Sequence, residues 1–156
     1  MENEHKYMRL ENAQQVLKEL KTIEKSMGDL RPVLRVIRRY LLNLIDENFE
    51  TQGQSSGEKW QEWSDSWKEY RKKINKQGNS ILEFNGDLRR SMLSQIKKDS
   101  LTIGSPLVYS AVHQFGYDEK NIPARPFFRF TDENIMDLQA EIHYFYLSKI
   151  KYAKPV

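Results

Sequence analysis

The chain has 156 residues, of which 38% are hydrophobic, 12% aromatic and 30% charged. Its 25 basic and 22 acidic residues leave a formal net charge of +3, which excludes the strongly basic character of a dedicated nucleic-acid-binding protein. The sequence contains no cysteine, so disulfides, thiolate metal ligands and cysteine nucleophiles are excluded too. This size and composition predict that residues 1–156 fold as a single domain.

The sequence shows no targeting or membrane signal. Residues 1–10 are polar and lack the apolar stretch of a signal peptide. The densest apolar stretch, residues 40–45, is far shorter than the roughly 20 residues of a membrane-spanning helix. We therefore expect a soluble protein that is not secreted and has no membrane partner.

Residues 1–50 are predicted to form an antiparallel helical hairpin. Apolar residues recur at three- and four-residue steps over residues 10–27, which places them on one helix face. After an interruption at Gly28, the same pattern resumes over residues 33–49, with Pro32 in the first turn, where proline is tolerated. The short break between two such helices favours a hairpin.

Residues 51–58 combine glycine, serine and glutamine without periodicity, which predicts an exposed loop. The tryptophans that follow, Trp60, Trp63 and Trp67, are three and four residues apart, and a short helix is expected to begin near Ser64. On a helix the three rings would form one aromatic ridge, either packed in the core or presented to another subunit.

A further short helix and a β-hairpin are predicted next. Asn85 or Asp87 is placed to cap the helix. Residues 93–98 and 101–104 have the alternating pattern of strands, and the two turn-forming residues 99–100 separate them, which predicts an antiparallel hairpin.

The last part of the chain alternates helix and extended structure. Residues 106–115 are predicted as a short helix closed by Gly116, because glycine best tolerates the left-handed conformation at a helix end. Residues 122–127 are expected to be extended, since each proline disfavours helix in the residue before it. Thr131 or Asp132 then caps a long C-terminal helix.

Together these elements predict an α+β fold with an N-terminal helical hairpin, a small antiparallel β-sheet and a long C-terminal helix. The hairpin occupies residues 1–50 and the exposed loop residues 51–58. A core of short helices and the β-hairpin occupies residues 59–130, and the C-terminal helix and tail occupy residues 131–156.

No residue pattern indicates a metal, cofactor or nucleotide site. The three histidines, His5, His113 and His143, lie in separate segments without metal-ligand spacing. None of the scattered glycines belongs to a phosphate-binding loop. We therefore predict no catalytic, metal-binding or cofactor-binding residues.

His113 and Arg125 are the polar residues most open to a functional interpretation. His113 shares a predicted helix face with Tyr109, and a lone histidine beside aromatic residues is more often structural than catalytic. An enzyme centred on His113 would need a polar cleft with a second catalytic group nearby. Arg125, between Pro123 and Pro126, is held on stiff backbone, where its planar guanidinium could bind a carboxylate of this chain or of a neighbour.

Two basic stretches keep a nucleic-acid-binding alternative open. Arg31, Arg35, Arg38 and Arg39 fall on one side of the second helix and could contact DNA phosphates or acidic partner surfaces, or simply be solvated. Residues 68–76 hold five basic residues, and the neighbouring tryptophans make base stacking conceivable. This alternative, a DNA-binding module, predicts steeply salt-dependent DNA affinity.

The order of short motifs resembles the phage virion morphogenesis, or tail completion, family of Mu-like phages and prophages. Five signatures occur in the family's order, and the last two are the most specific. They are Trp60, Trp63, Ser64 and Arg71; Ile81, Leu82, Gly86, Leu88 and Ser91; Ile103, Gly104 and Ser105; Tyr109, Ala111, His113, Gln114, Phe115 and Gly116; and Ile122, Pro123, Ala124, Arg125, Pro126 and Phe127.

The resemblance covers about residues 30–150, and it departs from the family pattern at Asn85, Ser110, Phe128 and Arg129. It implies a non-enzymatic structural protein of the virion, assembled in the bacterial cytoplasm, that completes the tail or joins head and tail. It also implies a homo-oligomeric ring that contacts tail or head–tail connector proteins. The interaction residues that it implies are Trp60, Trp63, Tyr109, His113, Phe115, Gly116, Pro123, Arg125, Pro126 and Phe127.

Overall fold

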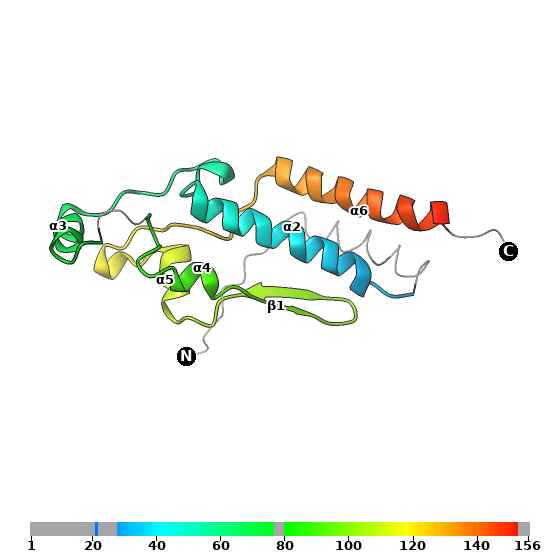
Figure 1. The fold of residues 1–156 in the computed structure, drawn as a ribbon, viewed down its shortest axis with the longest axis horizontal. Helices are drawn as coiled ribbons and strands as arrows, with labels where there is room; N and C mark the ends of the chain where they lie inside the picture. The colour runs from blue at the N-terminus through cyan, green and yellow to red at the C-terminus, as the bar shows by residue number, and fades with distance from the viewer. Residues whose placement is uncertain (1–20, 22–27, 77–79, 153–156) are drawn as a thin grey trace.

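The computed structural model describes residues 21, 28–76 and 80–152, so the helix predicted over residues 10–27 lies almost entirely outside the described residues. The central element is the helix α2, Arg31–Glu50. It lies between the long C-terminal helix α6, Asp132–Tyr152, and a two-stranded β-hairpin (Figure 1). The described part is therefore mostly helical with a small antiparallel sheet, as predicted.

Helix α2 confirms the second predicted helix. Pro32 lies in its first turn, where the missing N–H costs no helical hydrogen bond. The helix begins beside Asp29, whose carboxylate accepts hydrogen bonds from the main-chain N and the guanidinium of Arg31. It ends at Glu50, where the N–H of Thr51 donates to the carbonyl of Glu47 at 2.8 Å.

The first half of α2 packs against α6 through one hydrophobic cluster. Thr131 starts α6 with a reciprocal cap, because its Oγ1 accepts from the N–H of Asn134 and its own N–H donates to Asn134 Oδ1. Of the two predicted caps, Thr131 and Asp132, Thr131 is therefore the one that forms. The buried members of the cluster are Leu30, Val33, Leu34, Ile37, Leu138, Ile142 and Tyr146.

The second half of α2 belongs to a different cluster, which joins segments far apart in the sequence. Phe49 is fully buried, and its ring centroid lies 5.6 Å from that of Trp60 in an edge-on arrangement and 5.5 Å from that of Phe127. Burial of one such aromatic side chain contributes about 2 to 3 kcal/mol. The buried members of this cluster are Ile45, Phe49, Trp60, Ile81, Leu88 and Phe127.

The hairpin consists of β1, Leu93–Ile96, and β2, Leu101–Gly104, paired antiparallel with Ile96 opposite Leu101. The N–H of Lys97 donates to the carbonyl of Ser100 at 2.8 Å, so the two central turn residues are 98 and 99. The predicted turn at residues 99–100 was therefore wrong by one residue. Packing of Ile96 and Leu101 together against the α2 and α6 cluster fixes this register.

A short helix, α4 (Asp87–Arg90), follows the second cluster's Ile81 in sequence, and its cap differs from the prediction. Gly86 is the N-cap, and neither Asn85 nor Asp87 caps the helix. The carboxylate of Asp87 instead pairs with Arg90 at 2.9 Å within the helix. The expected cap was wrong because Asp87 is already the first helical residue and Asn85 precedes the glycine that serves as the N-cap.

Arg89 connects α4 to α2. Its guanidinium donates to Asp46 at 2.5 Å and to Glu50 at 2.8 Å, both on α2, and to Glu83 at 3.2 Å. One cation thus bridges three carboxylates from two parts of the chain. The Arg89 pairs raise its pKa, and the hydrogen bond from Arg89 lowers the pKa of Asp46.

Residues 51–58 are less exposed than predicted. They contain a 3₁₀ turn, Gln54–Ser56, in which Ser56 is buried, and Gly53 before it is buried too. The hydroxyl of Ser55 donates to Oδ1 of Asn48 on α2 at 2.9 Å. The segment that was expected to be exposed is thus partly buried, because small side chains such as Ser55 and Ser56 fit against the end of α2.

Candidate functional site

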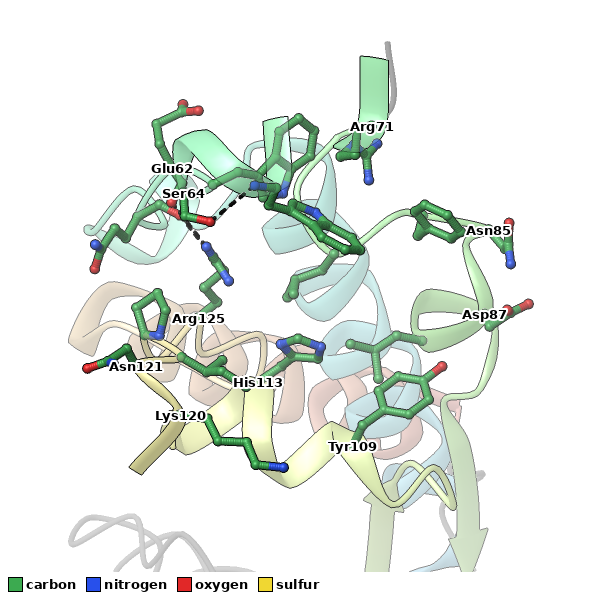
Figure 2. A pocket seen from close by; sticks show the side chains of 18 residues that line it. Glu62, Ser64, Arg71, Asn85, Asp87, Tyr109, His113, Lys120, Asn121 and Arg125 are labelled. Atoms are coloured by element: carbon green, nitrogen blue, oxygen red, sulfur yellow. Dashed lines mark hydrogen bonds between the residues drawn. The ribbon is translucent and has the colours of Figure 1, made fainter. Parts of the chain in front are cut away.

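Segments that carry the two most specific motifs enclose one side of a cavity of about 790 Å³ (Figure 2). The opposite wall comes from residues 61–64, from the helix α3 (Asp65–Lys73) and from residues 82–88. The side that carries the two motifs consists of helix α5 (Tyr109–Phe115) and residues 120–125. Such a volume is typical of cavities that bind small molecules or a few side chains.

The structure brings five of the ten expected interaction residues to this cavity. They are Trp63, Tyr109, His113, Pro123 and Arg125. The other five, Trp60, Phe115, Gly116, Pro126 and Phe127, are absent from its lining.

Trp60 and Phe127 are core residues, and the indole N–H of Trp60 donates to the carbonyl of Pro126 at 3.1 Å. The ring of Phe115 is 52% exposed. Some motif residues therefore stabilise the hydrophobic core, whereas others face the cavity or the solvent.

The predicted tryptophan ridge does not form. Helix α3 begins at Asp65 with Ser64 as its N-cap, as expected, so that Trp67 alone of the three tryptophans is helical. Trp60 is buried in the second cluster, Trp63 stacks on a guanidinium, and Trp67 stacks on Tyr70. The helical spacing of the three tryptophans was misleading because residues 60–64 lie outside any helix.

Arg71 forms part of the cavity wall, and its role differs from the surface charge that the sequence suggested. Its guanidinium carbon lies 4.0 Å from the centroid of Trp63 and 5.4 Å from that of Phe84. Its Nη2 donates to the carbonyl of Lys76 at 2.6 Å. The residue is only 2% exposed, and this burial lowers its pKa. The cation is therefore held between aromatic rings.

Arg125 is buried too. We expected its guanidinium to bind a carboxylate of this chain or of a neighbour; within the described residues its partners are main-chain carbonyls, and a neighbour's carboxylate stays a prediction. Its Nε donates to the carbonyl of Gln61 at 2.9 Å and its Nη2 to that of Glu62 at 3.2 Å. These bonds tie the proline-rich segment to the chain that leads into α3. Burial lowers the pKa of Arg125, and the charge of Glu62 partly offsets this effect. Main-chain carbonyls take this role because residues 61 and 62 pass beside the buried guanidinium.

Helix α5 begins at Tyr109 rather than at Pro106. Gly116 follows its last residue, as predicted, but does not adopt the left-handed helical conformation that was expected. Gly116 has φ +79° and ψ 175°, a combination that side chains disfavour. A Cβ atom there would lie 2.9 Å from the N of Ala124 and 3.0 Å from the O of Ile122. The N–H of Arg125 also donates to the carbonyl of His113 at 2.7 Å. The two motifs are thus in direct main-chain contact.

Gln114 is a residue whose role the sequence did not reveal. Its Oε1 accepts from the N–H groups of Phe127 and Phe128 at 3.1 and 3.0 Å, and its Nε2 donates to the carbonyl of Phe128 at 3.2 Å. From the other side, Asn48 Nδ2 donates to the carbonyls of Phe127 and Arg129. Two buried amides thus hold the segment after the proline motif.

His113 lies at the cavity, and its ring is edge-on to Tyr109 with 6.0 Å between centroids. Its Nδ1 is buried and has no hydrogen-bond partner among the residues that the structure describes. Burial, and then the positive charge of Arg125, lower the pKa of His113. The imidazole is therefore neutral at pH 7.

Metal-binding clusters and membrane-spanning helices are absent from the described residues. Within residues 28–76 and 80–152, no group of three or more histidine, aspartate or glutamate side chains could hold a metal ion. Within the same part of the chain, no helix combines the length and apolar character that crossing a membrane requires.

Comparison with known proteins decides the family. A family model described as the phage virion morphogenesis family matches residues 10–143. The chain belongs to this family. The resemblance inferred from the order of five motifs is thereby confirmed, and the match also includes the predicted first helix. As a member of the phage virion morphogenesis family, the chain is assigned to the assembly of phage or prophage particles in the host.

Two phage-derived relatives support the assignment. The chain is 36% identical over 121 residues to protein G of Escherichia phage Mu, whose name assigns it provisionally to capsid assembly. This alignment covers 73% of the chain and 75% of the relative. It is also 26% identical over 147 residues to G protein 2 of the Mu-like prophage FluMu in Haemophilus influenzae, covering 91% and 96% of the two chains.

A third relative is an uncharacterised protein of the archaeon Methanocaldococcus jannaschii, 34% identical over 97 residues, which are 58% of this chain and 70% of the relative. No solved structure matches the chain.

Proposed function

We propose that this virion morphogenesis protein is a structural component that acts in tail completion or in head–tail joining, and that it works as a homo-oligomeric ring without catalysis. The observation that carries the proposal is an exposed apolar stripe on α6. Met136, Tyr144 and Leu147 are 65%, 69% and 48% exposed, and Ala140 is exposed between them. Spacings of three, four and eight residues place these side chains on one helix face.

This stripe lies on the side of α6 opposite the buried face. The buried residues of α6, Leu138, Ile142 and Tyr146, already pack on α2. A helix of a monomeric protein has one apolar face, whereas a helix with two apolar faces indicates a second packing partner. Virion subunits assemble through such surfaces, so the second apolar face supports an oligomeric role.

A ring also requires two different complementary patches on each subunit. The outer side of α2 carries Arg35 and Arg39, both exposed. The start of α6 carries Asp132, Glu133 and Asp137, also exposed. Opposite charges on two helices of one subunit would steer head-to-tail contacts between copies.

The cavity supports a binding role better than a catalytic one. Two groups that could assist His113 are engaged elsewhere, because Asp87 pairs with Arg90 and the Arg125 guanidinium donates to main-chain carbonyls. General acid–base catalysis needs a positioned partner within hydrogen-bond reach. Among the described residues, Nδ1 of His113 has none.

The test is the oligomeric state of the purified full chain, measured by native mass spectrometry, together with mass spectrometry of purified particles. We expect a ring and incorporation into particles. Met136→Glu would place a charge in the stripe and dissociate the ring. Gln139→Glu adds the same charge on an exposed α6 position outside the stripe and would leave the ring intact. A monomeric wild-type chain that is absent from particles would refute the proposal.

A further inference from the structure

The cavity between α3 and α5 has an excess of positive charge. Arg71, Arg125 and Lys120 line it, against two carboxylates, Glu62 and Asp87. Asp87 is already paired with Arg90 at 2.9 Å, and in Figure 2 the Glu62 carboxylate points away from His113 and Arg125. A ligand with one negative charge would therefore improve the electrostatics of the site.

Two nitrogen atoms at one side of the cavity still lack hydrogen-bond partners. Nη1 of Arg125 makes no hydrogen bond within the described part of the chain, whereas its Nε and Nη2 are engaged. Nδ1 of His113 is buried without a partner there too. Both side chains face the cavity in Figure 2. A carboxylate that reached this point could accept hydrogen bonds from both, which would remove the cost of a buried, unsatisfied nitrogen.

Aromatic side chains form much of the rest of the cavity lining. Trp63, Trp67, Phe84 and Tyr109 line the cavity, and Trp67 and Tyr109 are 40% and 43% exposed. Partly exposed rings of this kind offer apolar contact area at little entropic cost, which is typical of sites that bind protein segments. The residues that flank the carboxylate in the ligand would therefore be apolar or aromatic.

Nucleic acid fits this cavity less well. Of its three cations, Arg71 and Arg125 are 2% and 7% exposed and spend donors on main-chain carbonyls, so Lys120 alone is exposed. Affinity for a phosphate backbone depends on many accessible cations. A single carboxylate needs one bidentate contact, which Arg125 Nη1 and His113 can supply.

We propose that this cavity binds an acidic segment of another virion protein, with an aspartate or glutamate carboxylate against Arg125 and His113 and an adjacent apolar side chain against the aromatic wall. The inference deepens the proposed assembly function and rests on it. It assigns the motif of α5 and the proline-rich motif a joint role in holding a partner, distinct from the α6 stripe that would hold copies together.

The test uses the full chain and two blocked tripeptides, acetyl-Phe-Glu-Phe-amide and acetyl-Phe-Gln-Phe-amide, which differ in one charged group. Binding is followed by NMR through the His113 ring and the indole signals of Trp63 and Trp67. We expect the acidic peptide to bind about tenfold more tightly than the neutral one. We also expect it to raise the pKa of His113, because a carboxylate stabilises the imidazolium.

Matched variants locate the contact. Lys120→Glu reverses a charge at the cavity and would weaken binding of the acidic peptide severalfold. Lys97→Glu makes the same change at an exposed position beside the hairpin turn and would have no effect. His113→Gln would reduce the preference for the acidic peptide over the neutral one.

Three outcomes would overturn the inference. Equal affinity for the two peptides would show an apolar slot without acid selectivity. No shift by either peptide up to roughly 10 mM would show that the cavity binds neither, since even weak peptide sites respond at that concentration. Tighter binding of an oligothymidine than of the acidic peptide would identify a nucleic-acid site. None of these results depends on ring formation, so the assembly proposal fails or stands separately.

Discussion

Gln114 pairs with Phe128 as one strand residue pairs with another. The side-chain Nε2 of Gln114 donates to the carbonyl of Phe128 at 3.2 Å, and the N–H of Phe128 donates back to Oε1 at 3.0 Å. Because Oε1 also accepts from the N–H of Phe127, one side chain satisfies three main-chain groups. The segment that follows the proline motif is therefore fixed to α5 by a side-chain amide, which among the other residue types only asparagine has, on a side chain one methylene shorter.

Gln114→Met should strongly destabilise the fold. Methionine fills a similar volume but leaves the three main-chain groups without partners inside the protein. The expected loss in the free energy of unfolding is about 2 to 4 kcal/mol. Urea denaturation followed by tryptophan fluorescence measures it. Gln95→Met, at an exposed position of β1, is the control and should change the stability by less than about 0.5 kcal/mol. Equal effects of the two substitutions would contradict the role assigned to Gln114.

Gly116→Ala should be more costly than Gly57→Ala, although both glycines have positive φ. Gly57 has φ +89° with open space where a Cβ would lie, so alanine would cost about 1 to 2 kcal/mol from the left-handed backbone alone. At Gly116 the extended ψ and the close N of Ala124 add to the strain, for a total of about 3 kcal/mol or more. Thermal unfolding of the two variants provides the comparison, and similar melting temperatures would rule out the tight approach of the two motifs.

Arg89→Gln should weaken the link between α2 and α4, by about 1 kcal/mol at pH 7 because the carboxylates are partly exposed. The pKa of Asp46 is lowered when folded, so this stabilisation is present above the unfolded value of 3.8 and is lost as pH falls through the lower folded value. The difference between wild type and variant should therefore be constant near neutral pH and shrink below about pH 4. Denaturation series at several pH values test this.

Arg90→Gln is the matched control for that series. Arg90 pairs locally with Asp87, and its side chain is 68% exposed, so its loss should cost less than about 0.5 kcal/mol. A cost as large as that of Arg89→Gln would show that bridging to α2 contributes nothing.

His113 should make the protein less stable in mild acid. Its folded pKa lies below the ordinary 6.5, so the unfolded chain takes up a proton that the folded chain refuses as pH falls through 6.5. Stability should decline from there until the folded pKa is reached. His113→Gln removes the group that takes up this proton. The melting temperature of the variant should therefore fall less than that of the wild type between pH 7 and about pH 5. Parallel declines in wild type and variant would contradict the burial of the imidazole.

The sequence predicted the long helices better than the site, for a physical reason. Periodic apolar residues report directly on a helix face, so α2 was expected with Pro32 in its first turn, and α6 with a cap at Thr131 or Asp132. The cavity depends on contacts between distant segments instead. In the sequence, Arg71 is one of several basic residues in residues 68–76. Only the folded chain brings the rings of Trp63 and Phe84 against its guanidinium.

Gln114 illustrates the same limit. Its motif was identified, but the partner of its amide lies beyond a chain reversal that residue pattern does not encode. Local spacing likewise did not indicate the partners of Arg125 within the chain, because the carbonyls that bind it belong to residues 61 and 62, which no local spacing connects to residue 125. Every residue has a main-chain carbonyl, so the type of a residue does not indicate whether its carbonyl accepts such a hydrogen bond.

Helix α2 has a mechanical consequence. Its 20 residues span about 30 Å, and its two halves are embedded in separate hydrophobic clusters. An unbroken helix resists bending far more than a loop, so a force applied at the α6 end travels along the axis to the cavity end instead of dissipating in a joint. In the described part of the chain, α2 is therefore a stiff helix anchored in a hydrophobic cluster at each end, an arrangement suited to bearing load between neighbouring subunits.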